Sequence, residues 1–302
     1  MQAPLQALPS PARKRWWTLL TTGILALFAP GCAQSLTHAP PTAAAAAPTR
    51  TIVLIHGMYV GPSSWDPWRE HFEARGYSTL APAWPGHETT AAQARAAHPD
   101  PDLAALDLPA VVDHYRRIVS ELDEPPVLVG HSMGGLVVQI LLAENLGSAG
   151  VAIGSAPPKG VFSLHPAFLK SNGRVLRGSL DDPLDMDPER FSNMFVNMLS
   201  PAEQQAVWES HARPESRRVG RAPTTAAGKV DFAGRRAPLL LLSGASDRTI
   251  PPSIGRKTFR RQRKADAITE YRVLPDAGHW LGGDAWRDAP AMTLDWLESN
   301  GV

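Results

Sequence analysis

Three side chains of this sequence have the types needed for nucleophilic catalysis, and they occur in the order serine, aspartate, histidine. Ser132 is the centre of the segment GHSMG at residues 130–134, Asp247 follows LLLLSGAS, and His279 follows VLPDAG. A serine hydroxyl is a weak nucleophile until a base takes its proton, and that base needs an acid that orients it. The three residues therefore have the types required for acyl transfer through a covalent intermediate.

The segment GHSMG fits the pattern G-x-S-x-G, which is weak by itself and is strengthened here by its surroundings. PPVLVG (125–130) is a short apolar run typical of a strand, and GGLVVQILLAENLG (134–147) is typical of a helix. A serine on a tight strand-to-helix turn is held in a strained conformation that exposes its hydroxyl, and the helix N-terminus adds partial positive charge nearby.

Strands and helices are expected to alternate along residues 51–302. The apolar runs that predict strands lie at 51–57, from 78 onward, and at 125–130, 150–158, 237–247 and 267–275. The predicted helices lie at 63–77, 108–122, 134–147, 250–264 and 289–299. This alternation predicts an α/β fold with a mostly parallel, doubly wound sheet. Ser132, Asp247 and His279 each lie at the carboxyl end of a predicted strand, at the edge where such sheets bind ligands.

Two stretches interrupt this alternation. Residues 90–108, which contain HPDPD, are expected to be irregular. Residues 159–236 contain helix-like pieces but no clear strand, and they lie between two predicted strands. We therefore expect a helical cap at about 159–236, inserted into a domain that spans 51–302.

The first fifty residues differ in composition from the rest. A basic segment at 13–15 precedes the apolar stretch WWTLLTTGILALFA (16–29), which is shorter than a membrane span and fits an export signal at 1–31. Cys32 follows, as in bacterial lipoprotein signals, so a membrane tether through a lipidated Cys32 and cleavage without lipid both remain open. Residues 32–50 are rich in alanine and proline and are expected to be a linker. We expect an exported bacterial protein that is periplasmic, secreted or attached to the outer membrane.

Composition and sequence patterns argue against disulfide-rich, metal-binding and nucleic-acid-binding proteins. The 302 residues are 43% hydrophobic and 20% charged, with net charge +1 and a single cysteine, so no disulfide framework or cysteine metal site is expected. The basic run GRKTFRRQRK (255–264) is interpreted as the solvated face of a helix, because no aromatic platform accompanies it. We expect no nucleic-acid partner, no metal and no cofactor, since neither metal-ligand spacing nor a phosphate loop occurs.

Four blocks, LIHGMYVGPSSW, GHSMGG, GASDRTIP and DAGHW, occur in this order, and through them the chain resembles the α/β-hydrolase fold superfamily over residues 51–300. The resemblance implies that Ser132 is the nucleophile and that His279 is the base that later acts as the acid. It implies that Asp247 orients the histidine. Asp276, three residues before His279, is the competing acid.

The resemblance also predicts the groups around the nucleophile. The backbone N–H groups of Met58 and Met133 are expected to form the oxyanion hole. Residues within these blocks and in the cap are expected to bind substrate: Tyr59, His131, Phe195, Met198 and Trp280.

The resemblance implies a serine hydrolase that cleaves a small-molecule carboxylic ester through an acyl-enzyme. Haloalkane dehalogenases and epoxide hydrolases of this fold have aspartate where this chain has Ser132. Lactonases, amidases, C–C hydrolases, hydroxynitrile lyases and cofactor-free perhydrolases or haloperoxidases share the three residues, so these reactions remain open, as does a non-catalytic binding protein. A lipase for long acyl chains is disfavoured, because the sequence shows no long exposed apolar lid.

Overall fold

The computed structural model describes residues 50–302. The predicted export signal, Cys32 and all of the predicted linker except Arg50 lie outside the described residues, so export and lipid attachment stay predictions. None of the helices within 50–302 combines the length and the apolar character that crossing a bilayer requires.

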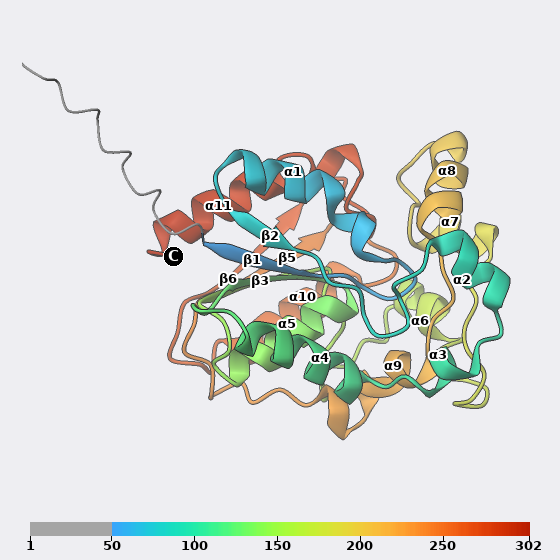
Figure 1. Cartoon of the computed structure of the whole chain (residues 1–302), viewed down its shortest axis with the longest axis horizontal. Helices are drawn as coiled ribbons and strands as arrows, with labels where there is room; N and C mark the ends of the chain where they lie inside the picture. Colours follow the sequence, from blue (N-terminus) through green and yellow to red (C-terminus); the bar gives the residue numbers. More distant parts are fainter. Residues whose placement is uncertain (1–49) are drawn as a thin grey trace, which may run out of the picture. The chain divides into compact units, whose positions relative to one another are not determined.

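Six parallel strands form one sheet in the order β2-β1-β3-β4-β5-β6 (Figure 1). The α/β prediction is confirmed, and every strand pairing in the sheet is parallel. The chain order reverses direction between β1 and β3, which creates a crevice at the carboxyl ends of these two strands. The strands are β1 (Thr51–Ile55), β2 (Ser78–Leu80), β3 (Val127–His131), β4 (Ala149–Ile153), β5 (Leu239–Gly244) and β6 (Thr269–Leu274).

Helices cover both faces of the sheet because the strands are apolar on both sides. In β1, Ile52 and Leu54 belong to one apolar cluster, while Val53 and Ile55 belong to the other. The first cluster packs against α1 (Asp66–Ala74) and α11 (Ala289–Ser299), and the second packs mainly against α4 (Leu108–Ser120) and α5 (Met133–Ala143), with α10 (Pro252–Gln262) on the same side (Figure 1).

The helix α4 shows how the local sequence determines where a helix begins and which of its faces is buried. Asp107 accepts a hydrogen bond from the Ala110 amide and so caps the helix at the residue before it begins. Five of its side chains are buried, and three of them, Val111, Tyr115 and Val119, recur every fourth residue on one face. Burying each such side chain stabilises the fold by roughly 1.5–3 kcal/mol.

The prediction that residues 90–108 are irregular is wrong, because two capped helices form there: α2 (Ala91–Ala97) and α3 (Pro101–Ala105). The Thr90 side chain and the Gln93 side chain each bond the other's backbone amide in a capping box. Asp100 accepts hydrogen bonds from two amides at the start of α3. These caps stabilise helices that carry little apolar periodicity.

Between β4 and β5 the chain forms helices and no strand of the sheet, as predicted for the cap. We call α6 (Pro166–Asn172), α7 (Pro188–Met194), α8 (Pro201–His211) and α9 (Arg217–Arg221) the cap helices. They gather at the end of the sheet to which β1 points (Figure 1). Short 3₁₀ turns complete the fold at Pro62–Trp65, Ala222–Thr224, Ala226–Gly228 and Asp284–Trp286.

Candidate active site

Ser132 stands at the junction of β3 and α5 in a strained backbone conformation, with φ 55° and ψ −117°. Such a conformation costs a non-glycine residue about 1–3 kcal/mol and persists only where the surroundings hold it. Here the Ser132 amide donates to the Ile153 carbonyl at 2.9 Å, and its carbonyl accepts from the Ala156 amide at 2.8 Å. The neighbouring strand β4 therefore fixes the turn.

The two glycines of the GHSMG segment let α5 approach the sheet closely. A Cβ atom at Gly134 would collide with the carbonyl oxygen of Ile55 in β1, and one at Gly130 would collide with the Gly134 carbonyl. Any larger residue would push the helix away from the strands, and Ser132 would move with it.

A continuous line of hydrogen bonds joins the three predicted catalytic side chains. His279 Nε2 lies 3.1 Å from Ser132 Oγ, and His279 Nδ1 lies 2.7 Å from Asp247 Oδ2. The other oxygen of Asp247 accepts the amide hydrogens of Thr249 and Ile250 at 2.8 and 2.7 Å. All three catalytic side chains are buried. A carboxylate held in this way favours the tautomer with hydrogen on Nδ1, which leaves Nε2 free to accept the serine proton.

The competing acid does not reach the histidine. Asp276 is exposed and has φ 55°, and it makes no hydrogen bond to His279 within residues 50–302. The geometry therefore brings Asp247, and not Asp276, to the imidazole.

His131 packs against His279 and does not line the cavity beside Ser132, although it was predicted to bind substrate. Its ring centre is 4.6 Å from that of His279, and its side chain is buried. Burial, reinforced by the adjacent His279, holds the pKa of His131 well below its ordinary value of 6.5. His131 is therefore a neutral packing group next to His279.

The loop after β1 touches Ser132. A Cβ at Gly57 would lie only 2.7 Å from Ser132 Cβ, so the loop backbone passes directly over the serine. Within residues 50–302 the Met58 amide has no hydrogen-bond acceptor. Met133 is the first residue of α5, where an amide has no acceptor inside the helix. Both residues line the cavity that Ser132 lines.

His56 holds the base of this loop. Its Nδ1 lies 2.9 Å from the Gly57 carbonyl, and its Nε2 accepts the Trp84 amide hydrogen at 3.2 Å. Burial, followed by the nearby His87, lowers the pKa of His56 well below 6.5. A neutral His56 with these two bonds fits a shaping role for the loop.

Sequence reasoning missed a buried polar cluster behind the loop. Glu215, from the segment between α8 and α9, contacts His87 at 3.0 Å and accepts the Tyr59 amide hydrogen at 3.4 Å. The Arg213 amide donates to the Tyr59 carbonyl at 3.1 Å, and its guanidinium donates to the His87 carbonyl at 3.0 Å. The segment HARPES carries no periodic or motif signal, so only the fold brings it to the loop.

A cavity of about 260 Å³ lies beside Ser132, lined mostly by apolar side chains. Of the residues predicted to bind substrate, Tyr59 and Phe195 line it. Met198 and Trp280 do not. They line a second hollow of about 320 Å³ instead. Phe195 lines both this hollow and the cavity beside Ser132.

The exposed edge of the cavity is apolar, although the sequence shows no long exposed apolar lid. Phe162 is 71% exposed and Leu164 85% exposed, and both line the cavity that reaches Ser132. Leu169 and Leu176 are about half exposed and line it too. Long acyl chains could therefore find apolar contacts at this edge.

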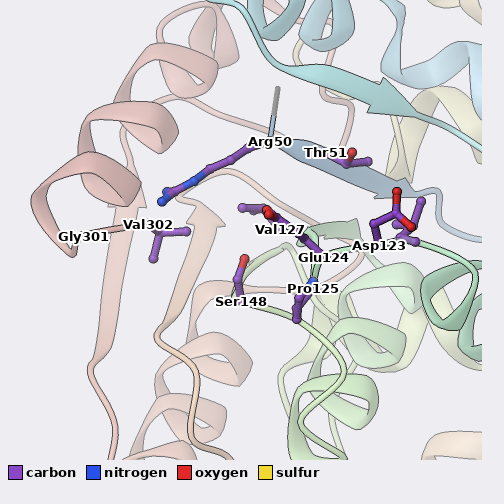
Figure 2. A pocket seen from close by; sticks show the side chains of 10 residues that line it. Arg50, Thr51, Asp123, Glu124, Pro125, Val127, Ser148, Gly301 and Val302 are labelled. Carbon is purple, nitrogen blue, oxygen red and sulfur yellow. The ribbon is translucent and has the colours of Figure 1, made fainter. Parts of the chain in front are cut away.

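A larger cavity, of about 580 Å³, lies at the opposite edge of the sheet. Figure 2 shows it between Thr51 and Val127, at the amino ends of β1 and β3, with Arg50 reaching toward Val302. Ser132 lies at the carboxyl end of β3, so this cavity is remote from it.

Comparisons with known proteins agree with this fold. The crystal structure of a monoacylglycerol lipase from Paleococcus ferrophilus has a TM-score of 0.60 and 22% identity, covering 83% of this chain and 96% of that one. A methylesterase from Arabidopsis has a TM-score of 0.61 and 16% identity, covering 83% and 99%. A pyrethroid hydrolase from Sphingobium faniae has a TM-score of 0.55 and 18% identity, covering 83% and 96%. At these identities the likeness shows the fold alone.

No curated protein sequence matches the chain significantly. The sequence profile of the alpha/beta hydrolase family, however, matches residues 52–291, which include the strand-to-helix turn at Ser132 and the strand ends that carry Asp247 and His279. The chain therefore belongs to the alpha/beta hydrolase family.

Proposed function

We propose that this protein is a serine-dependent hydrolase that cleaves carboxylic esters through an acyl-enzyme. The observation that carries the proposal is the hydrogen-bonded line from Asp247 through His279 to Ser132, with 2.7 and 3.1 Å between the bonded atoms, beside an apolar cavity. Family membership supports the hydrolase class, and the line of side chains supports the serine mechanism.

In the first half-reaction Ser132 Oγ attacks the ester carbonyl carbon while its proton passes to His279 Nε2. The negative charge of Asp247 stabilises the imidazolium that forms, because its oxygen lies 2.7 Å from Nδ1. As the tetrahedral intermediate collapses, the carbon–oxygen bond to the alcohol breaks and His279 returns the proton to the leaving oxygen. The products of this stage are the free alcohol and the acyl group on Ser132.

Water completes the reaction by the same route in reverse. His279 takes a proton from water as the water oxygen attacks the acyl carbon, and then gives a proton to Ser132 Oγ as the carboxylic acid departs. In both stages the negative carbonyl oxygen would be stabilised by the amides of Met58 and Met133, and losing one such donor typically costs about 10²–10³ in rate.

The cavity supports a substrate with an apolar acyl or alcohol group. Val161, Phe168, Val175 and Ile250 line it together with the two methionines, so an alkyl or aryl group would be removed from water there. Each buried methylene contributes about 0.8 kcal/mol, which predicts a rise in kcat/KM with chain length until the cavity is filled.

The test combines labelling with a substrate series. A sulfonyl fluoride should place one adduct on the peptide that contains Ser132, and mass spectrometry of the protein mixed with a p-nitrophenyl ester should detect a transient acyl-enzyme. Turnover of p-nitrophenyl esters should increase from acetate to longer acyl chains. A folded protein that takes no label and turns over no ester would favour a binding protein. Cleavage of a cyanohydrin in preference to every ester would instead indicate a hydroxynitrile lyase, and preferred cleavage of a lactone would indicate a lactonase.

A further inference from the structure

The apolar side chains at the cavity mouth continue onto the surface as one exposed patch. Phe162 and Leu164 precede α6, Leu169 lies on α6, and Leu176 follows it, so all four come from a single segment of the chain. Exposed apolar residues that stand singly need no explanation, whereas a cluster beside a binding site marks an interaction surface.

A basic groove adjoins this patch. Phe162 also lines a hollow of about 540 Å³ between the loop 159–164 and α10. The charged side chains of this hollow are Lys257, Arg260, Arg261 and Lys264, with no acidic residue among its described lining.

The structure fixes the loop and the basic helix together. Lys257 Nζ donates to the Phe162 carbonyl at 2.7 Å, and the Arg261 guanidinium donates to the Gly160 carbonyl at 3.2 Å. Beneath them, Val161 is buried against Ile250 and Ile254. Apolar and basic side chains are therefore presented side by side on a packed base.

Part of this positive charge is not neutralised by the described protein. The side chains of Arg260 and Lys264 are exposed and make no hydrogen bond or ion pair within residues 50–302. The whole chain has a net charge of only +1, so the basic character is local to this face. The run that the sequence suggested was merely a solvated helix face thus borders the mouth of the cavity.

We propose that this apolar and basic face, formed by Phe162, Leu164, Leu169 and Leu176 with Lys257, Arg260, Arg261 and Lys264, docks onto an anionic lipid surface. Basic side chains near such a surface are attracted to its headgroups, and exposed apolar side chains enter the boundary with the acyl chains. A nucleic acid would satisfy the charges but would leave the four apolar side chains in water.

Docking on this face has a consequence for catalysis, which rests on the proposed ester hydrolysis. The same apolar side chains line the cavity that reaches Ser132, so the cavity would open onto the lipid layer. An apolar ester dissolved in that layer would enter without crossing water. The docking itself does not depend on catalysis and is tested by binding alone.

Sedimentation with vesicles tests the proposal on a chain that starts at Arg50. This chain keeps every described element and all four apolar clusters, and it lacks the apolar stretch 16–29, which could bind lipid by itself. We expect binding to phosphatidylglycerol vesicles at low ionic strength, at least about tenfold weaker binding to phosphatidylcholine vesicles, and release by salt.

Two double variants separate the contributions of the basic and the apolar side chains to vesicle binding. Arg260→Glu with Lys264→Glu should weaken binding to anionic vesicles at least about tenfold and leave hydrolysis of a water-soluble short ester unchanged. The matched control, Arg117→Glu with Arg236→Glu, reverses two exposed charges near the amino ends of the strands and should bind like the unaltered chain. Phe162→Ser with Leu164→Ser should also weaken binding, whereas Ile268→Ser, a half-exposed apolar residue before β6, should not. Thermal unfolding verifies that each variant folds.

Several outcomes overturn the proposal. These are equal binding to anionic and neutral vesicles, no binding to either, and equal weakening by the control variants. Retention on heparin without binding to vesicles would assign the basic side chains to a soluble polyanion instead. Loss of ester hydrolysis with vesicle binding intact would refute the proposed function and leave the docking in place.

Discussion

Glu215 and His87 form a fully buried pair, with the carboxylate Oε2 3.0 Å from the imidazole Nε2. The same oxygen accepts the Tyr59 amide hydrogen at 3.4 Å, and the other oxygen accepts the Ser216 amide hydrogen at 2.7 Å. Tyr59 has φ 67° and directly follows Met58. The pair therefore holds a strained residue next to a proposed oxyanion donor, and it does so from a segment 156 residues away in sequence.

Glu215→Gln should lower kcat about ten- to a hundredfold, with a smaller change in KM. Glutamine has one acceptor oxygen where glutamate has two, and that oxygen would stay with the Ser216 amide, the shorter of the two bonds. The NH2 group would then face the Tyr59 amide hydrogen and cannot accept it, so the loop would lose one of its two bonds to the cap segment and the Met58 amide would lose its fixed position. An oxyanion donor acts mainly in the transition state, which is why kcat carries the effect. Steady-state kinetics on a p-nitrophenyl ester measures both constants.

Glu189→Gln is the matched control, because Glu189 is exposed on α7 and its side chain has no described hydrogen bond. It should leave both constants unchanged. An equal loss of kcat in the control, or a Glu215→Gln protein with full kcat, would contradict a positioning role. A purely structural role predicts instead that the melting temperature falls while kcat of the folded fraction is kept.

Asp247→Asn should reduce kcat about 10⁴-fold while the protein stays folded, because asparagine can stabilise the wrong histidine tautomer and cannot balance the imidazolium charge. Asp276→Asn provides a direct comparison. Asp276 is exposed and three residues before His279, so sequence spacing alone keeps it as a competitor. Its substitution should leave turnover within about twofold. A reversed pattern in the kinetics of the two variants would exchange the assigned acid.

The three proposed catalytic residues can be predicted from the sequence because the signal for each is local. A serine flanked by glycines between an apolar strand and a helix can be recognised in a few residues, and the later strand ends then limit the places for the acid and the base. The loop proposed to supply an oxyanion donor is found in the same way, since His56 and Gly57 directly follow β1 and Met58 comes next.

The position of the cap in the chain could be predicted from the sequence, but its contacts could not. Its contact with the oxyanion loop depends on Arg213 and Glu215, which meet Tyr59 only after the chain has folded across the sheet edge. The residues that line the pocket could not be predicted for the same reason. Phe195 and Met198 are three residues apart, yet only Phe195 reaches the cavity beside Ser132. The helices at 91–105 were missed because caps, and not apolar periodicity, define them.

Gly134→Ala should destabilise the protein by about 1–3 kcal/mol or prevent folding, because the new methyl group would collide with the Ile55 carbonyl and a backbone atom cannot rotate away. Gly283→Ala tests the same change where the nearest atom is 3.7 Å from the added Cβ. The free energy of unfolding of this variant should lie within about 0.5 kcal/mol of that of the original protein. Urea unfolding gives both values, and equal stabilities would show that α5 can shift without cost.

The free energy of unfolding should decrease as the pH falls from about 6.5 to 5. Burial is the main cause that lowers the pKa of both His56 and His131 well below 6.5. The folded protein therefore keeps both rings neutral while the unfolded chain binds protons near its ordinary pKa. With more protons on the unfolded state, acid favours unfolding, by up to about 1.4 kcal/mol per pH unit for each histidine. Above about pH 6.5 this contribution to stability is fully present.

Urea unfolding followed by tryptophan fluorescence at several pH values between 8 and 5 measures this slope. His56→Asn should reduce the slope by about 1.4 kcal/mol per pH unit, because one buried neutral ring is gone. His165→Asn removes an exposed histidine at the start of α6 and keeps a side chain able to cap that helix, so the slope should stay as it was. A free energy of unfolding that is constant or rises between pH 6.5 and 5 would mean that the buried rings take up protons in the folded state, and His56 could then not accept the Trp84 hydrogen bond that shapes the oxyanion loop.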